Sequence, residues 1–321
     1  MIVVCGAGGF IGGHFVAELL RDGQMPVRAV DLKPLAKWEQ LHVGIENVQL
    51  DLRDRDACFA AAEGGRVIYN FAADMGGMGY IAMNRIACMR NVLINTHVLE
   101  AAVEAGVEEY FFASSACVYN TCLQRSPDVV PLKESDAYPA LPEDGYGWEK
   151  LFSERACQAY GEDTSIKVRI ARFHNIYGPF GAYYGGREKA PAAICRKVAL
   201  AKLSGHHQIE IWGDGKQTRS FTYISDCVDG IRKMMTSSCR EPLNLGSAEM
   251  VSIDQLVDIV EGFDGLRLQR HYDLSAPIGV AGRSSDNSRV LAELNWEPST
   301  PLVVGLENVY RWVYNQLAQG R

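Results

Sequence analysis

A tyrosine and a lysine in the middle of the chain could carry acid–base chemistry. Tyr146 and Lys150 stand in the run Tyr-Gly-Trp-Glu-Lys, and this spacing places both side chains on one face of a helix. A nearby ammonium lowers the pKa of a phenol from its reference value of about 10, which would suit Tyr146 to remove a hydroxyl proton. Ser115, at the end of an expected buried strand, could hydrogen-bond the same hydroxyl. The alternative is a packing tyrosine beside a surface lysine.

A cysteine and a second lysine could move protons on carbon. Cys117 follows Ser115 by two residues, so it leaves the same strand end in a similar orientation. A thiol, whose reference pKa is about 8.5, becomes a useful base near a cation or a charged cofactor. Lys189 lies in a Gly-Gly-Arg-Glu-Lys-Ala-Pro loop that could fold over a ligand from the opposite side. Inversion at carbon requires such a two-sided pair, but a small core cysteine and a solvated loop lysine remain alternatives.

The N-terminal glycines predict a dinucleotide site. Gly6, Gly9 and Gly12 follow an expected strand and open an expected helix. Glycine there permits a tight turn and close approach to a pyrophosphate, which the amides of the helix N-terminus then bind. Asp31 ends the next strand, where a carboxylate bonds ribose hydroxyls and repels a 2′-phosphate, so NAD is favoured over NADP. The alternative is a flexible surface turn with an incidental aspartate.

Other residues are expected around the same cofactor. Phe10 and Ile11 lie inside the glycine loop, and Ala72 follows the fourth strand. Asp51 and Leu52 end the third strand, where they could bracket the adenine. A solvated loop carboxylate is the alternative for Asp51.

The elements that must position these residues alternate in the first half of the chain. Strands are expected at 1–4, 27–30, 48–50, 67–71 and 110–113, and the clearest helix at Asn84–Ala105, where apolar residues recur every three or four positions. Strands alternating with helices indicate an α/β fold with a Rossmann-type, doubly wound parallel sheet.

The second half predicts a smaller substrate-binding lobe. A loop is expected at 177–186, a strand at 221–224, and helices at 191–203, 226–236, 253–262 and 305–317. We expect residues 1–175 to form the NAD-binding domain, with 221–245 returning to it, and residues 176–220 and 246–321 to form the lobe.

Composition narrows the class of protein. The 321 residues are 47% hydrophobic and 22% charged, with a net charge of −7, which fits a globular protein and argues against partners such as nucleic acid or a membrane surface. The nine cysteines form no CxxC pair, so no metal site is expected and reduced thiols in the cytoplasm are the simplest interpretation. No segment reads as a signal peptide or a membrane span.

Several motifs together resemble a known family. The glycine loop, Asn-Phe-Ala-Ala at 70–73, the serine pair at 114–115, the Tyr–Lys pair and Asn-Ile-Tyr-Gly-Pro at 175–179 are similar to those of extended short-chain dehydrogenases/reductases that act on nucleotide sugars. The resemblance covers essentially the whole chain. It implies an NAD cofactor and a homodimer built through helices such as 84–105 and the Tyr146 helix.

Longer runs resemble the members of this family that invert C3 and C5 of a GDP-hexose. These runs are 75–79, 114–117, 172–175, 185–191 and 212–220. The resemblance implies that Cys117 and Lys189 are the epimerising pair. It also implies contacts with a GDP-sugar substrate from Gly77, Ser115, Asn175, Glu188, Lys189, Lys197, Gln217, Arg219 and Arg283. The two arginines would suit a diphosphate, because guanidinium groups bind phosphate bidentately.

Two kinds of rival function remain at this point. The nearest is another NAD-dependent nucleotide-sugar enzyme, namely a 4-epimerase, a 5-epimerase or a 4,6-dehydratase. The Cys117–Lys189 pair argues against a 4-epimerase and a dehydratase, but does not separate single from double epimerisation. The other rival is a non-catalytic NAD-binding sensor, a class that tends to lose the tyrosine or the lysine that is intact here.

Overall fold

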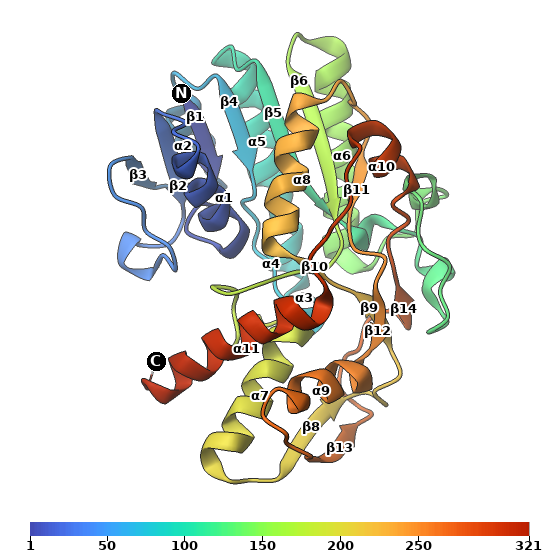
Figure 1. The fold of residues 1–321 in the computed structure, drawn as a ribbon. Coiled ribbons are helices and arrows are strands. Elements are labelled where there is room, and N and C mark those ends of the chain that lie inside the picture. The colour runs from blue at the N-terminus through green and yellow to red at the C-terminus, as the bar shows by residue number, and fades with distance from the viewer. Residues whose placement is uncertain (321) are drawn as a thin grey trace.

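A seven-stranded parallel sheet forms the larger part of the protein, in a computed structural model that describes residues 1–320 (Figure 1). The strand order is β11-β6-β5-β4-β1-β2-β3. The strands are β1 Ile2–Cys5, β2 Val27–Asp31, β3 Glu46–Gln49, β4 Val67–Asn70, β5 Glu109–Ser115, β6 Lys167–Phe173 and β11 Leu243–Leu245. From β1 the chain adds β2 and β3 on one side, and then returns to add β4, β5 and β6 on the other. Ligands of such sheets bind at the carboxyl ends of the strands near this change of direction.

Helices cover both faces of the sheet. On one face α1 (Phe10–Arg21) and α8 (Ile224–Thr236) pack on each other and share an apolar core with β1, β2 and β4. On the other face lie α2 (Arg55–Ala62), α5 (Asn91–Glu104) and α6 (Asp144–Asp163). The prediction of a Rossmann-type, doubly wound α/β fold is therefore confirmed.

A smaller lobe lies below the carboxyl ends of the strands (Figure 1). Three helices with their own apolar core build it, and three short ladders form small sheets separate from the seven-stranded sheet. The helices are α7 Ala190–Ser204, α9 Ile253–Gly262 and α11 Leu302–Ala318. The ladders are β8 Gln208–Trp212 with β13 Gln269–Asp273, β9 Thr218–Ser220 with β12 Met250–Ser252 and β14 Gly282–Arg283, and β7 Ile176–Tyr177 with β10 Thr222–Tyr223.

Short elements complete the chain. They are α3 Met78–Met83, α4 Arg85–Met89, α10 Ser288–Leu294, and the 3-10 turns η1 Leu35–Lys37, η2 Ala116–Val118, η3 Thr121–Gln124 and η4 Glu134–Ala137. One sequence expectation is wrong here. The helix expected over 84–105 is split at Arg90, because buried Asn91 bonds the backbone of Asp74 through both its amide atoms. The run 75–79 includes the start of α3 at Met78.

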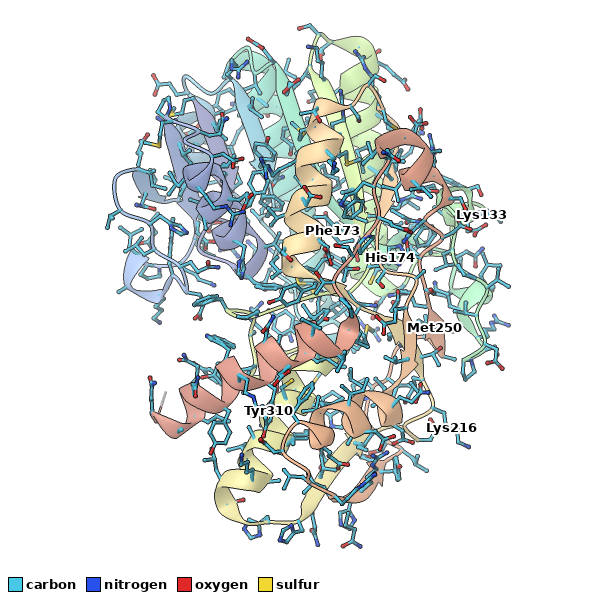
Figure 2. The ribbon with its side chains drawn as sticks, in the orientation of Figure 1. Lys133, Phe173, His174, Lys216, Met250 and Tyr310 are labelled. Carbon is cyan, nitrogen blue, oxygen red and sulfur yellow. The ribbon has the colours of Figure 1, made fainter. Side chains whose placement is uncertain are left out.

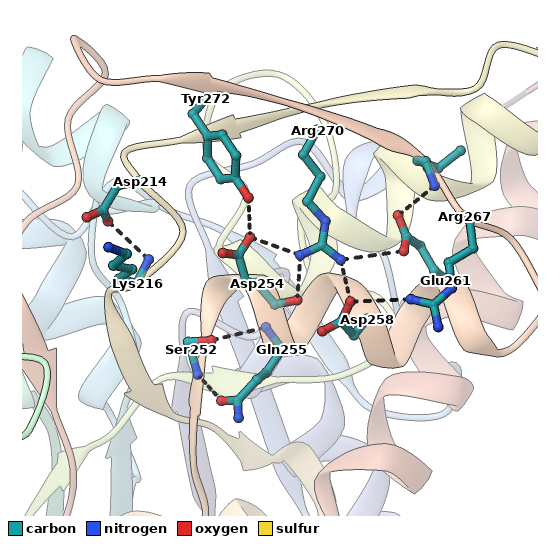
Figure 3. Close-up of polar contacts among 11 residues, drawn as sticks. Asp214, Lys216, Ser252, Asp254, Gln255, Asp258, Glu261, Arg267, Arg270 and Tyr272 are labelled. Carbon is teal, nitrogen blue, oxygen red and sulfur yellow. Dashed lines mark hydrogen bonds and ion pairs between the residues drawn. The ribbon is translucent and has the colours of Figure 1, made fainter.

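One arginine fastens helix α9 to the outer ladder of the lobe (Figure 3). Arg270 on β13 lies 3.0 Å from Asp254 and 3.6 Å from Glu261, and it also pairs with Asp258. Tyr272 on the same strand donates to Asp254 over 2.9 Å. These contacts fix the rim of the lobe and reach no residue of the predicted site.

A buried ion pair joins the sheet to the helix that carries Tyr146. Arg172, at the end of β6, meets Glu154 on α6 at 2.7 Å, and both side chains are almost fully enclosed. Ser114 also bonds Glu154. Figure 2 shows the next residues, Phe173 and His174, at the junction between the sheet and the lobe.

Replacing Glu154 by Gln should lower the free energy of unfolding by about 3–5 kcal/mol, because it leaves the Arg172 guanidinium buried without its counter-charge. Chemical denaturation followed by circular dichroism measures this. As a control, Glu108→Gln breaks an exposed pair with Arg66 whose atoms lie 3.5 Å apart, which should cost under about 1 kcal/mol. Equal losses in the two variants would contradict the prediction.

Candidate active site

A cavity of about 540 Å³ lies where the carboxyl ends of the strands meet the lobe. The predicted cofactor residues all line it. Four of the five predicted catalytic residues line it too, and the fifth, Cys117, lies outside the lining. Its lining includes Gly6, Gly9, Phe10, Ile11, Gly12, Asp31, Asp51, Leu52, Ala72, Ser115, Tyr146, Lys150 and Lys189. Residues from the loop after β1, from β2, β5 and α6, and from the loop before α7 are thus brought together from distant parts of the sequence.

The glycine loop has the shape that a pyrophosphate requires. Gly6 has a φ of +82°, which favours glycine. A Cβ at Gly12 would lie 2.2 Å from the Gly6 carbonyl oxygen, so α1 can pack against the strand only with glycine there. No side chain caps the N-terminus of α1, which leaves its first amides directed to a ligand. These features fit a dinucleotide.

Two aspartates stand on the same side of the cavity. The Asp31 carboxylate accepts from the Lys33 amide at 2.9 Å, and Lys33 Nζ donates to the Gly8 carbonyl at 3.0 Å. Asp51 is held by Arg53, and this hydrogen bond lowers the pKa of the Asp51 carboxyl. Both carboxylates can therefore face a ribose or an adenine as fixed acceptors.

The Tyr146–Lys150 pair is buried on α6. Lys150 Nζ lies 5.7 Å from the centre of the Tyr146 ring and 4.8 Å from that of Phe112. Burial raises the pKa of Tyr146 well above its ordinary value, with the Cys117 sulfur adding to the rise and a hydrogen bond with Ser115 opposing it. This direction is opposite to the one that the Tyr–Lys spacing predicts, because desolvation of the phenol is the largest effect on its pKa.

Cys117 packs against Tyr146 in a small apolar cluster. Its amide donates to Ser115 Oγ at 3.2 Å, which begins the turn η2 directly after β5. Burial raises the pKa of Cys117, while the positive charge of Arg283 opposes the rise. Burial lowers the pKa of Lys189, and interaction with the Cys117 sulfur acts in the other direction. Desolvation therefore favours the neutral thiol and the neutral amine.

Contacts of Arg187 hold the loop that carries Lys189 against α3 and the loop that precedes it. Arg187 donates to Asp74 at 2.7 Å, and its guanidinium lies 3.9 Å from the centre of the Tyr80 ring. The Gly77 amide donates to the Arg187 carbonyl at 3.0 Å, and a Cβ on Gly77 would meet the Glu188 carbonyl at 2.3 Å. The sequence analysis missed Asp74, Tyr80 and Arg187. Their only signal in the sequence is their position, since Asp74 and Tyr80 flank the run 75–79 and Arg187 lies in the run 185–191.

The predicted substrate residues other than Ser115 and Lys189 lie outside the lining of this cavity. Most of them bond other protein groups. Asn175 donates to the Ser220 carbonyl, Glu188 pairs with Arg196, Lys197 donates to the Glu210 carbonyl at 2.7 Å, and Gln217 donates to the Trp212 carbonyl. Arg219 donates to the carbonyls of Thr218, Ile278, Val280 and Ala281.

Arg219 differs from Arg283 because, within residues 1–320, its hydrogen bonds go to backbone carbonyls and none goes to a carboxylate. Burial lowers the pKa of Arg219 to about 10, and repulsion from Arg283 adds to this. It still carries its charge near neutral pH, so it can receive an anion.

Arg283 is enclosed and fully engaged. Its Nε donates to Gln124 at 2.6 Å and its Nη2 to Glu143 at 2.7 Å, while Nη1 lies 3.6 Å from Cys117 Sγ. Glu143 is a further residue that the sequence analysis missed, since a lone glutamate before a helix gives no signal of what it faces.

Within residues 1–320, no group of three or more His, Cys, Asp or Glu side chains could hold a metal ion. In the same part of the chain, the nine cysteines are all free, and no helix combines the length and the apolar character that crossing a bilayer demands.

This fold and this site define a family. Residues 2–246 match the model of the NAD dependent epimerase/dehydratase family, and the chain belongs to it. Its cofactor is NAD. The chain is 44% identical over 317 residues to GDP-mannose 3,5-epimerase of Arabidopsis thaliana, covering 98% of this chain and 82% of that one, and equally similar to GDP-mannose 3,5-epimerase 1 of rice (Oryza sativa subsp. japonica).

Solved structures agree with the fold. MoeE5 in complex with UDP-glucose and NAD superposes with a TM-score of 0.82 at 29% identity, covering 98% of this chain and 99% of that one. UDP-glucose 4-epimerase of Thermotoga maritima superposes with a TM-score of 0.87 at 21% identity, covering 98% and 99%. The second likeness concerns the fold alone.

Proposed function

We propose that this protein converts GDP-D-mannose to GDP-L-galactose by inverting C3 and C5, with GDP-L-gulose formed when C5 alone is inverted. The observation that carries the proposal is that Lys189 lines the same cavity as Tyr146 and Ser115, and that Cys117 packs against Tyr146. The identity with the plant enzymes supports the substrate and both carbons.

The proposed chemistry begins at C4. Bound NAD supplies hydride acceptance and return at this carbon. Tyr146 takes the C4 hydroxyl proton, Ser115 bonds the same oxygen, and Lys150 holds the nicotinamide ribose and assists the phenol. The C4 carbonyl then acidifies the hydrogens on C3 and C5, so that Cys117 and Lys189 can remove and return protons from opposite faces.

Burial shifts both groups toward their neutral forms, and these forms suit the exchange. The amine accepts the proton that leaves carbon on one face, and the thiol gives a proton to carbon on the other. The completed C–H bond therefore leaves an ammonium and a thiolate, and a proton must pass from the ammonium to the thiolate before both groups are back in their starting forms. We propose that Arg219 binds the diphosphate, because within residues 1–320 this cation donates to backbone carbonyls and to no carboxylate. Gly77, Asn175, Glu188, Lys197 and Gln217 are proposed as further substrate contacts from the resemblance.

We also propose the division of the chain expected from the sequence. Residues 1–175 with 221–245 would form the NAD-binding domain, and 176–220 with 246–321 the substrate-binding lobe. The cavity between sheet and lobe supports this, since Lys189 and Val309 line it together with the glycine loop.

Isotope exchange tests the activity. The protein is incubated with GDP-α-D-mannose in heavy water, and deuterium in the recovered sugar is located by NMR. Deuterium at both C3 and C5 is the expected result. Label at C5 alone would replace the proposal by a single-site epimerase, and no label with NAD bound would reject it.

We further propose that the protein acts in the cytoplasm as a homodimer. Helices α3, α4, α5 and α6 contact one another and carry large exposed apolar side chains. Met83 is 84% exposed and Ile86 79% exposed, and the same helices also expose Met89, Leu93, Trp148 and Phe152. Apolar patches of this kind mark protein interfaces. A second copy of this chain is the proposed occupant, as the resemblance implies.

The double variant Ile86→Glu, Phe152→Glu should sediment as a monomer, because two charges per copy would be buried without partners at the interface. Sedimentation velocity measures the change, and circular dichroism checks the fold. Leu274→Glu is the control, since Leu274 is 76% exposed but lies in the lobe, and it should leave the assembly intact. A wild-type monomer would refute the interface.

A further inference from the structure

Glu143 is a buried carboxylate with no place in the chemistry described so far. It stands at the N-terminus of α6, the helix of Tyr146, yet its side chain does not cap that helix. It pairs instead with Arg283 at 2.7 Å, and its own amide donates to the Cys117 carbonyl at 2.9 Å. One residue therefore contacts both the backbone of Cys117 and the cation beside its sulfur.

Arg283 can meet the sulfur only in a fixed orientation. Gln124 takes Nε and Glu143 takes Nη2, so Nη1 is left directed at Cys117 Sγ, 3.6 Å away. All three residues are enclosed, so the ion pair is shielded from solvent and from salt. These contacts favour a role at the thiol, whereas the resemblance implies a contact with the diphosphate.

We propose that Glu143 is a positioning residue, whose ion pair with Arg283 holds the guanidinium against the Cys117 sulfur and sets the charge that the thiol meets during proton transfer. The proposal deepens the proposed function, because it assumes that Cys117 is one of the two proton-transferring groups. Glu143 acts through Arg283 and through its own side-chain contact with the Cys117 thiol. It does not itself touch the sugar.

The opposite signs of the two charges give opposite expectations. Without the carboxylate, the uncompensated guanidinium stabilises the thiolate. Without the guanidinium, the carboxylate destabilises it. Other groups also face Cys117 and contribute in both cases, namely Lys189 before α7, Arg219 on β9, Tyr146 on α6 and Cys88 on α4. These groups are the same in both variants. Shifts of the Cys117 titration in opposite directions therefore report on Glu143 and Arg283.

The test is an ultraviolet titration of the Cys117 thiolate in the NAD-loaded protein, with the same protein carrying Cys117→Ser as the blank. In Glu143→Gln the titration should move to lower pH by about one unit or more, and in Arg283→Gln to higher pH. Glu143→Asp, which restores the charge, should titrate near the wild type. Glu134→Gln is the matched control, because Glu134 is equally buried but bonds the Asn244 amide.

Several outcomes would overturn the proposal. An unshifted titration in a folded Glu143→Gln protein does so, and so does a shift in the same direction in both variants, since that indicates general loosening. If Arg283→Gln does not fold, the Gln and Asp variants of Glu143 decide alone. A wild type that incorporates no deuterium, but shows the opposite shifts, would reject the proposed function and still support the pairing of Glu143 and Arg283 at the thiol.

Discussion

Tyr146→Phe should lower kcat for GDP-mannose by about 100- to 10,000-fold, the range over which a positioned proton acceptor contributes to catalysis. The phenyl ring keeps the packing against Cys117 and Ile81, so the fold and NAD binding should be retained. Steady-state turnover by NMR and NAD content after purification measure the two effects separately.

The matched control for this variant is Tyr69→Phe. Tyr69 is also buried, but it lies on β4 and does not line the cavity. The Tyr69→Phe variant should convert GDP-mannose at the wild-type rate. Unchanged biological activity of Tyr146→Phe would favour a non-catalytic NAD-binding protein over an enzyme.

Removing either member of the epimerising pair should abolish inversion without abolishing the chemistry at C4. We expect Cys117→Ala and Lys189→Met each to lose deuterium incorporation by about 100-fold or more. The 4-keto sugar should still form, because Tyr146, Lys150 and Ser115 remain in place. Mass spectrometry of the quenched sugar, after borodeuteride reduction, detects that intermediate.

Cys195→Ala serves as the control for the cysteine. It removes the same thiol from the buried core of the lobe, so it should affect stability more than exchange. Full deuterium exchange in Cys117→Ala would show that another group moves the proton on carbon. Exchange lost at one carbon only would assign Cys117 or Lys189 to that carbon.

The sequence predicted those parts of the fold that depend on local pattern. The glycine loop, the Rossmann-type sheet and α9 at 253–262 follow from periodicity and from the demands of a tight turn. The break near Arg90 could not be seen, because it depends on Asn91 reaching Asp74 across space. An amphipathic pattern continues through such a break without change.

The site shows the same division. Tyr146, Lys150 and Ser115 belong to a spacing that the chemistry requires, and this spacing is visible in one dimension. Glu143 has no such spacing to its partners, since Gln124 and Arg283 come from a different turn and a different strand. Likewise, the raised pKa of Tyr146 follows from burial, which depends on the packing of the finished fold.

Helix α11 ties the cofactor site to a segment far from the glycine loop in the sequence. Val309 of this helix lines the cavity, and a Cβ on Gly305 would meet the Tyr177 hydroxyl oxygen at 2.2 Å. The wall of the pocket that begins at Gly6 is therefore incomplete until about three hundred residues further along the chain have folded onto it. A substitution in α11 can in this way reach the dinucleotide without touching the glycine loop.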